Sequence, residues 1–402
     1  MGTSTLPTPE PHSRSVRKLR SKIPGSVLLV ITVILFLQFA ILPRFLKEPG
    51  QAQLRLSHFE LEKLDAGLRK CEVLKTPPVE YAFPVSSSRA NPRWNAKRGQ
   101  NKTVLLLNAV LFDGERFTGA KDIRFHNGVI VSVTEAGSTK FKLREAEVID
   151  LKGKHVTPGL VDMHSHHLVW RWPQLPGPDG PNEMHKDFGP LTPFVRSLDS
   201  IKGDDKATEL IAAGGITSSL ILPGSGNIMG GEGFMVKNVL LSGKDGEEVV
   251  EELLLEHGVK KEERRRYLKM ACGENPSKLY KHTRMGDAWI FRQHMERAKE
   301  LVGKQDEWCL SAAAARERGD AGTISALVAT VGGAKGGLPE ELELDSSVAM
   351  LREQININVH CYEPEDFEDM LLHSKEFGFK IKAFHHALAA WKVPEMLKEQ
   401  AG

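Results

Sequence analysis

The sequence is poor in cysteine and has almost no excess of charge of either sign. Its 402 residues include four cysteines with no closely spaced pair, which excludes a small scaffold held together by many disulfides. Lysine and arginine total 54, and aspartate and glutamate 52, so nothing indicates a nucleic-acid partner. Cys272 and Cys361 adjoin residues discussed below, and we expect both to pack in the core, because buried cysteine is common. The cysteines alone leave the redox compartment open.

A long hydrophobic run stands near the N-terminus. From Ile23 to Leu42 no side chain is charged, and about 20 such residues suffice for a helix to cross a bilayer. The run exceeds the apolar region of a cleaved signal peptide, about 7–15 residues, so we expect a signal anchor at residues 23–43. The positive-inside rule places the basic residues 1–22 in the cytoplasm. We therefore expect a single-pass membrane protein whose main domain lies in the secretory-pathway lumen or outside the cell, with Asn101 of the Asn-Lys-Thr sequon glycosylated.

Three different patterns follow the hydrophobic run. Residues 44–100 combine a helical stretch with a segment rich in Pro, Ser and Asn, which indicates a stalk and linker. Residues 101–157 contain short β-branched runs that end in Asp-Gly, Asn-Gly or Lys-Gly turns, and they predict a small β-sandwich domain. In residues 158–402, apolar runs alternate with helical stretches, which is typical of βα units around a parallel sheet. Six strands are expected there, at residues 160–164, 216–222, 235–240, 267–271, 355–361 and 379–384.

The strongest motif is VTPGLVDMHSHH, in which a Pro-Gly turn leads into a short strand that ends in His-Ser-His. Alternate residues of a strand share a face, so His164 and His166 point the same way and can hold one ion. Neutral imidazoles suit a divalent metal, zinc first among them. His167 has the opposite parity and is expected to be structural.

The sequence around this motif resembles the amidohydrolase superfamily. The resemblance rests on an N-A-x-x-x-D-G opening, at residues 108–114, followed by V-x-P-G-L-V-D-x-H-x-H. Later segments, among them ILPGSGNIMGGEGFMVKN and LKMACGENPSKLY, look like the branch close to imidazolonepropionase and the family 9 carbohydrate esterases. The resemblance implies a (β/α)8 barrel with a metal site at the C-terminal mouth. Asp162, on the strand parity of the two histidines, would be a supporting catalytic residue.

Two further histidines are candidate ligands near the C-terminus. In ININVH the polar residues alternate with apolar ones, so His360 is expected to point into the barrel at the end of its strand. In FKIKAFHH the same test favours His386, and the family's spacing to an aromatic-lysine pair, here Trp391-Lys392, favours the same residue. His385 stays possible because strand ends bend.

The fourth strand of such a barrel offers a carboxylate, or a lysine that becomes carboxylated, to the metal. Glu274 is the first choice and Lys269 the alternative, since parity cannot be followed across Gly273. A cap on the next helix is an equally good explanation of Glu274. The loop PGSGNIMGGEG lacks the ending of a phosphate-binding P-loop and is expected to form barrel rim.

The resemblance implies a metal-dependent hydrolase of non-peptide C–N bonds in small molecules. The general base would be an aspartate at the end of an eighth strand, yet we find no candidate for a seventh or eighth strand before Gly402, so the barrel is expected to be incomplete. The sequence therefore leaves enzymatic activity open. The alternatives are a truncated, inactive metal-binding or interaction protein and an N-acetyl sugar deacetylase. Neither the substrate nor the oligomeric state can be inferred from the sequence.

Overall fold

The computed structural model describes residues 55–75, 103–138, 146–170, 172–174, 179–239, 249–329 and 337–398, with five helical residues between 26 and 36. Residues 1–57 and 58–402 are separate compact units, and the fold below is that of the second. Several predictions lie outside the described residues: the cytoplasmic segment 1–22, most of the anchor 23–43, much of the linker 44–100, and the glycosylation site Asn101. The cytoplasmic segment, the linker and the glycosylation site therefore stay predictions.

The expectation of a single-pass membrane protein is contradicted. A spanning helix needs about 20 consecutive apolar residues. None of the helices in the described part of the chain is both long and apolar enough to cross a membrane. The longest of the described helices is α7 (Arg284–Arg318).

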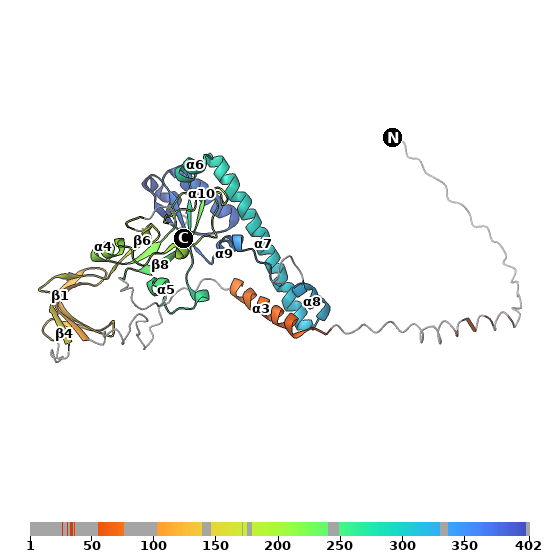
Figure 1. Cartoon of the computed structure of the whole chain (residues 1–402), viewed down its shortest axis with the longest axis horizontal. Coiled ribbons are helices and arrows are strands. Elements are labelled where there is room, and N and C mark those ends of the chain that lie inside the picture. The colour runs from red at the N-terminus through yellow and green to blue at the C-terminus, as the bar shows by residue number, and fades with distance from the viewer. Residues whose placement is uncertain are drawn as a thin grey trace, which may run out of the picture. The chain divides into compact units, whose positions relative to one another are not determined.

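The first sheet of the unit contains five strands (Figure 1). They are β1 (Thr103–Phe112), β2 (Phe117–His126), β3 (Val129–Glu135), β4 (Ala146–Asp150) and β5 (His155–Val156), in the order β3-β2-β1-β4 with β5 also paired to β1. Asp113 begins the β1–β2 turn, where its carboxylate accepts hydrogen bonds from two backbone amides and Gly114 has a φ of 111°. In the described residues these strands form one mixed sheet, where a sandwich was expected.

The second sheet carries the predicted chemistry and has six strands. They are β6 (Leu160–Ser165), β7 (Ile216–Ile221), β8 (Met229–Lys237), β9 (Tyr267–Ala271), β10 (Asn356–Cys361) and β11 (Ile381–His386), side by side in the order β11-β10-β9-β8-β7-β6. The prediction of an all-parallel sheet was wrong at β8, which runs antiparallel to β7 and β9. Ile221 and Met229 are too close in sequence for a crossover helix, which needs a dozen or more residues. The expected rim loop therefore supplies the first half of this strand.

The helices pack on the second sheet or on one another. The longer helices are α3 (His58–Lys75), α7, α8 (Ala321–Ala329) and α10 (Pro364–Phe377). The shorter helices are α4 (Ala207–Ala213), α5 (Val249–Leu253), α6 (Glu274–Tyr280), α9 (Asp345–Leu351) and α11 (Pro394–Lys398). The 3-10 turns are η4 (Ser197–Ser200), η5 (Lys261–Glu263), η6 (Leu342–Leu344) and η7 (Ala390–Lys392). Apolar residues of β9 and β10 form the main core with α7, α9 and α10. Strand alternation sends Lys269, Asn358 and His360 to the other face.

Two disulfides tie distant parts of the chain together. Cys71 of α3 is bonded to Cys309 of α7, next to the point where Gly67 packs against the Trp308 indole. Cys272 is bonded to Cys361, at the ends of β9 and β10. The sequence analysis expected core packing for Cys272 and Cys361. Both are buried, but they pack as a bonded pair, because they lie opposite each other on neighbouring strands.

Candidate metal centre

The predicted histidines meet where the strands of the second sheet end. β6 and β11 are the two outer strands of this sheet, yet His164 Nδ1 of β6 lies 2.8 Å from His385 Nδ1 of β11. The sheet therefore curls until its outer strands converge. The His386 ring lies 4.6 Å from that of His164 and 4.7 Å from that of His360, measured between centroids. Residues 221 positions apart in the sequence thus share one site.

A chain of hydrogen bonds fixes which nitrogens of His385 and His164 carry protons. The side-chain nitrogen of Asn358 donates to the Asn356 carbonyl. The group of Asn358 that lies 2.9 Å from His385 Nε2 is therefore its side-chain oxygen, which can only accept. His385 Nε2 is therefore the protonated nitrogen, and its bare Nδ1 accepts from His164 Nδ1. A neutral His164 then has a bare Nε2.

His166 also has an unprotonated nitrogen, and this nitrogen faces Nε2 of His164. Its Nδ1 donates to the Leu222 carbonyl at 2.8 Å, which leaves Nε2 without a proton in the neutral ring. The Nε2 atoms of His164 and His166 are 3.2 Å apart. Two lone pairs facing each other at this distance repel unless a cation lies between them. Two nitrogens bound to one tetrahedral zinc ion at about 2.0–2.1 Å would be about 3.3–3.4 Å apart.

Burial keeps these imidazoles neutral. Desolvation lowers the pKa of His164 to about 2 and that of His385 to about 4, and it also lowers the pKa of His166. The positive charge of Lys269 acts in the same direction on all three histidines. Protonation of either imidazole at neutral pH is therefore disfavoured, so a proton does not relieve the repulsion between the two Nε2 atoms.

Glu274 and His360 form the other side of the cluster. Glu274 Oε1 lies 2.8 Å from His360 Nε2, and the Asn275 amide is 3.3 Å from the same nitrogen. Glu274 reaches this position because Gly273 adopts a φ of 73°, which reverses the chain between β9 and α6. In the described part of the chain, His360 Nδ1 is buried without a hydrogen-bond partner. A buried, unpaired imidazole nitrogen of this kind can bind an ion or hydrogen-bond to water.

The register of β11 determines which of His385 and His386 lies on the same side as His360. Ile357 pairs with Ile381, but Asn358 pairs with Ala383, so one residue of β11, Lys382, is left over. This irregularity reverses the parity used in the sequence analysis and turns His385 to the same side as its partner His360. His386 has a φ of 61° and also lies against the cluster. The choice between the two as ligand stays a prediction.

Lys269 and Asp162 lie beside the histidines. Lys269 is fully buried in β9, where desolvation lowers its pKa to about 7 and its Nζ donates to the Pro223 carbonyl. The Asp162 carboxylate accepts the backbone amide of His164, so it orients the strand end. His167, expected to be structural, bonds to Asn238 and Ser165 away from the cluster. The roles of Lys269 and Asp162 in catalysis stay predictions.

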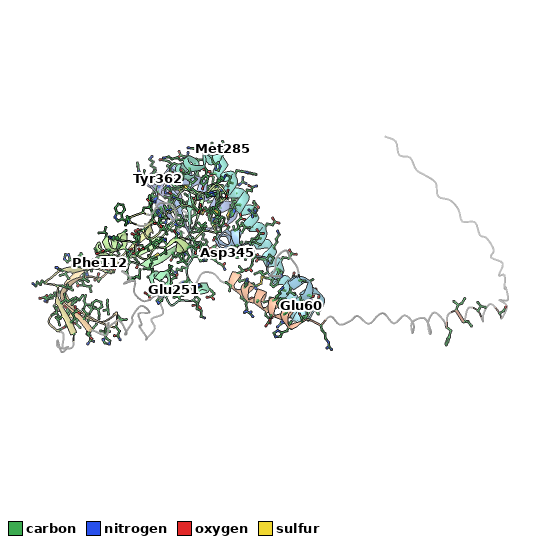
Figure 2. All side chains as sticks on the ribbon, viewed as in Figure 1. Glu60, Phe112, Glu251, Met285, Asp345 and Tyr362 are labelled. Carbon is green, nitrogen blue, oxygen red and sulfur yellow. A yellow bond between two sulfur atoms is a disulfide. The ribbon has the colours of Figure 1, made fainter. Side chains whose placement is uncertain are left out.

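Some contacts of this site were not found from the sequence. Asn358 orients His385, and Asn275 links His360 to Ser225 of the glycine-rich loop. Tyr362, labelled in Figure 2, follows β10. Its ring centroid lies 4.6 Å from that of His360. The polar alternation of ININVH already placed Asn358 on the same face as His360. The Asn275 and Tyr362 contacts depend on turns after strands, which the alternation pattern does not reach.

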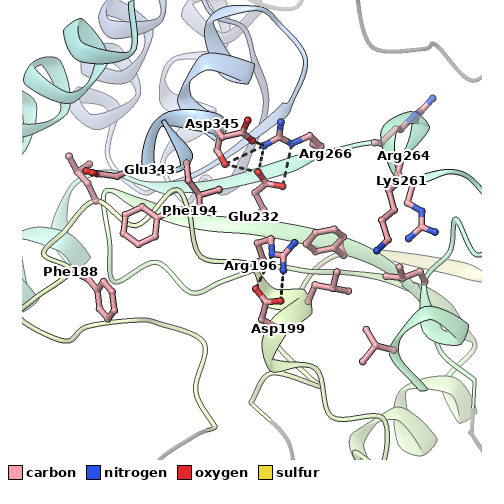
Figure 3. Close-up of a pocket in the computed structure, with 18 of the residues that line it drawn as sticks. Phe188, Phe194, Arg196, Asp199, Glu232, Lys261, Arg264, Arg266, Glu343 and Asp345 are labelled. Carbon is pink, nitrogen blue, oxygen red and sulfur yellow. Dashed lines mark hydrogen bonds and ion pairs between the residues drawn. The ribbon is translucent and has the colours of Figure 1, made fainter. Parts of the chain in front are cut away.

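Two hollows adjoin the strand ends. One of about 390 Å³ is lined by Glu274, Arg284 and neighbouring residues, and so borders the cluster. A larger one of about 1290 Å³ lies at the opposite end of β9, where Arg266 bonds to Glu232 and Asp345 (Figure 3). Arg196, Arg264 and Arg266 bond there to acids of this chain, and Lys261 also lines this hollow. The chemistry-bearing residues lie at the other end of the strand.

The donor set fits a divalent metal in part. Across the described residues, no group of three or more His, Cys, Asp or Glu side chains is arranged to hold an ion. The facing Nε2 atoms of His164 and His166 supply two ligands of the right type and spacing, and His360 supplies an orphaned nitrogen nearby. Two imidazole nitrogens thus face each other at a spacing that a metal ion accepts, with further donor atoms adjacent to them.

Comparisons with known proteins point to one superfamily. No protein-family model matches the chain. It is 35% identical over 366 residues to the amidohydrolase tasK of Hapsidospora irregularis, an alignment that covers 86% of this chain and 35% of that protein. The chain thus spans about a third of the length of this curated relative.

Solved structures give a similar result. An amidohydrolase from Thermotoga maritima MSB8 matches with a TM-score of 0.56 and 28% identity, covering 74% of this chain and 67% of that chain. A second amidohydrolase structure, 14% identical over 71% of this chain and 61% of its own, has a TM-score of 0.26, too low to support an argument. The curated relative and the Thermotoga structure support the amidohydrolase superfamily as the family of this mixed α/β chain.

Proposed function

We propose that this chain carries the metal site of a hydrolase that cleaves a non-peptide C–N bond, in an amide or cyclic amide, in a small molecule. The observation that supports the proposal is the pair of bare Nε2 atoms of His164 and His166, which face each other at 3.2 Å in a buried site. The likeness to proteins named amidohydrolases supports the same class of reaction.

The proposed ligands are His164 and His166, with Glu274, His360 and one of His385 and His386 nearby. Zinc is the first candidate, because neutral imidazole with a carboxylate is a donor set that it accepts. A divalent cation held there would supply Lewis acidity, which acidifies water and polarises a carbonyl oxygen. Lys269 remains the alternative to Glu274 as the ligand from the fourth strand of the family's barrel.

The chain's own residues orient the donors. The Leu222 carbonyl holds the proton of His166 on Nδ1, and Asn358 does the same for His385 on Nε2, so the remaining nitrogens stay bare. Asp162 holds the backbone of His164, and Glu274 holds His360. A fixed tautomer and ring orientation are what a metal ligand requires from its neighbours.

The proton acceptor of the reaction is not assigned. The expected aspartate would end an eighth strand, and no strand follows β11 in the described part of the chain. The expectation of an incomplete barrel stays a prediction, as does the choice of branch near imidazolonepropionase.

Metal content tests the proposal most directly. The full chain, stripped and reloaded with zinc, is expected to bind it stoichiometrically and to lose it in the variant His164→Ala with His166→Ala. His167→Ala is the matched control, because this adjacent histidine bonds to Asn238 away from the cluster. Circular dichroism verifies that each variant is folded. A folded wild-type protein that binds no zinc would refute the proposal.

Turnover separates the remaining alternatives. The zinc-loaded protein would be assayed for release of amine or ring opening on cyclic amides and on N-acetyl sugars. Hydrolysis of a cyclic amide supports the proposal, whereas cleavage restricted to N-acetyl sugars indicates the deacetylase. Bound zinc without turnover on either class would indicate an inactive metal-binding protein.

A further inference from the structure

The disulfide between Cys272 and Cys361 lies at the candidate metal centre. Ala271 pairs with His360 in the parallel β9–β10 ladder, and the two cysteines follow these residues directly. The backbone amide of Cys272 also donates to the His360 carbonyl at 2.9 Å. Cys361 is completely buried and Cys272 is 8% exposed, so the bond stands in the interior beside the last pair of the ladder.

Each cysteine is next to a residue of the cluster. Cys361 follows His360, and Cys272 is separated from Glu274 by Gly273 alone. The Glu274–His360 contact of 2.8 Å therefore connects two segments that are bonded covalently one or two residues away. Glycine is the residue with the greatest backbone freedom, so the position of Glu274 depends on what fixes the chain around it.

Gly273 packs against a salt bridge on one side. A Cβ on Gly273 would lie 2.3 Å from Asp366 Oδ2, and Asp366 is held by Arg284 at 2.6 Å. This contact excludes a side chain but does not anchor the glycine. The preceding residue is attached to β10 covalently by the disulfide, which reinforces the backbone hydrogen bond from Cys272 to His360.

We propose that the Cys272–Cys361 disulfide is a positioning element of the metal centre, because it holds the end of β9 on β10 and thereby keeps the Glu274 carboxylate against the His360 imidazole. The inference rests on the proposed function for its metal readout. It assigns to the two cysteines a role beyond packing. Groups that orient metal ligands typically change metal affinity about 10–100-fold when they are lost.

The second disulfide provides a matched control. Cys71 and Cys309 are 238 residues apart in sequence, against 89 for Cys272 and Cys361, and they join α3 to α7. A bond that closes a longer loop restrains the unfolded chain more. Loss of Cys71–Cys309 should therefore lower stability at least as much, without changing the affinity of the site for zinc.

The test compares Cys272→Ala/Cys361→Ala with Cys71→Ala/Cys309→Ala in the full chain. Zinc affinity is measured by competition with a chromophoric chelator, and stability by denaturant unfolding of the metal-free proteins. We expect a 10–100-fold loss of zinc affinity in the first variant alone. Equal zinc affinities in the two variants would overturn the proposal. So would peptide mapping that finds Cys272 and Cys361 as free thiols in protein purified in air, without added reductant.

Two further measurements keep the outcome decisive. If the first variant does not fold, folded wild-type protein is reduced with a small dithiol, and the opened pairs are identified by alkylation and mapping before zinc affinity is measured. Hydrogen exchange of the Gly273 and Glu274 amides is followed in metal-free protein. Faster exchange after loss of Cys272–Cys361 supports positioning even if the wild type binds no zinc, which would refute the proposed function alone. Unchanged exchange there would refute the positioning role.

Discussion

Replacing Lys269 by methionine should stabilise the metal-free protein below about pH 9. Lys269 is completely buried, and burial alone lowers its pKa from 10.5 to about 7. The unfolded chain keeps the ordinary value and so binds the proton more readily than the folded chain does. The resulting loss of folding stability, which is the free-energy cost of burying the Lys269 ammonium, is complete below pH 7. It shrinks as the pH rises from 7 to 10.5 and disappears above 10.5.

The magnitude follows from the same two values. The interval between 10.5 and about 7, at about 1.4 kcal/mol per pH unit, corresponds to a penalty of roughly 5 kcal/mol at pH 6. Methionine has a similar length and no charge, but it loses the hydrogen bond from Nζ to the Pro223 carbonyl, worth about 1 kcal/mol. The net gain at pH 6 should thus be roughly 3–4 kcal/mol.

Urea unfolding between pH 6 and 9, in the presence of a chelator, measures this effect. The wild type should gain about 2 kcal/mol between pH 7 and 9 relative to Lys269→Met, since the slope contributed by this lysine is at most about 1.4 kcal/mol per pH unit. Lys382→Met, at an exposed lysine of β11, is the control and should retain the pH dependence of the wild type. Parallel stability curves for the wild type and Lys269→Met would refute the reasoning.

Further predictions concern packing, the turn before α6, and the protons of the cluster. Gly67→Ala should destabilise the protein by about 1–3 kcal/mol in thermal unfolding, because its Cβ would lie 2.2 Å from the Trp308 ring, whereas Gly303→Ala, with open space around it, should not. Gly273→Ala should reduce both stability and zinc affinity, since φ is 73° and the Cβ would meet Asp366; an unchanged affinity would contradict the role given to this turn. Asn358→Leu should weaken zinc binding about 10–100-fold in chelator competition, because it frees the tautomer of His385; equal binding would refute the hydrogen-bond chain. Because burial lowers the pKa of His166 and brings that of His164 to about 2, dialysed protein should retain zinc below pH 6.5, and release centred at 6.5 or above would contradict this.

Part of this site could be predicted from local sequence periodicity. The alternation in ININVH placed His360 and Asn358 on one face, and both lie buried on the face opposite the apolar core. The His-x-His spacing placed His164 and His166 together, and their Nε2 atoms lie 3.2 Å apart. Both inferences depend only on the two-residue repeat of a strand, which holds wherever the strand is regular.

Other features could not be predicted because they depend on irregular backbone or on partners distant in sequence. The leftover Lys382 in the β10–β11 pairing reverses the parity that favoured His386, and no local pattern marks it. The direction of β8 depends on a connection too short for a crossover helix, whereas the repeated βα pattern predicts a parallel strand there. The disulfide partners are 89 and 238 residues apart, and pairing at such distances cannot be inferred from spacing.

The bond between Cys71 and Cys309 has a consequence for limited proteolysis. Helix α3 precedes the first strand of the β domain, and its bonded partner α7 follows β9. A peptide bond cleaved anywhere between residues 75 and 103 would leave α3 covalently attached to the remainder of the chain. The two pieces would migrate as one band on a non-reducing gel and separate only after a thiol is added.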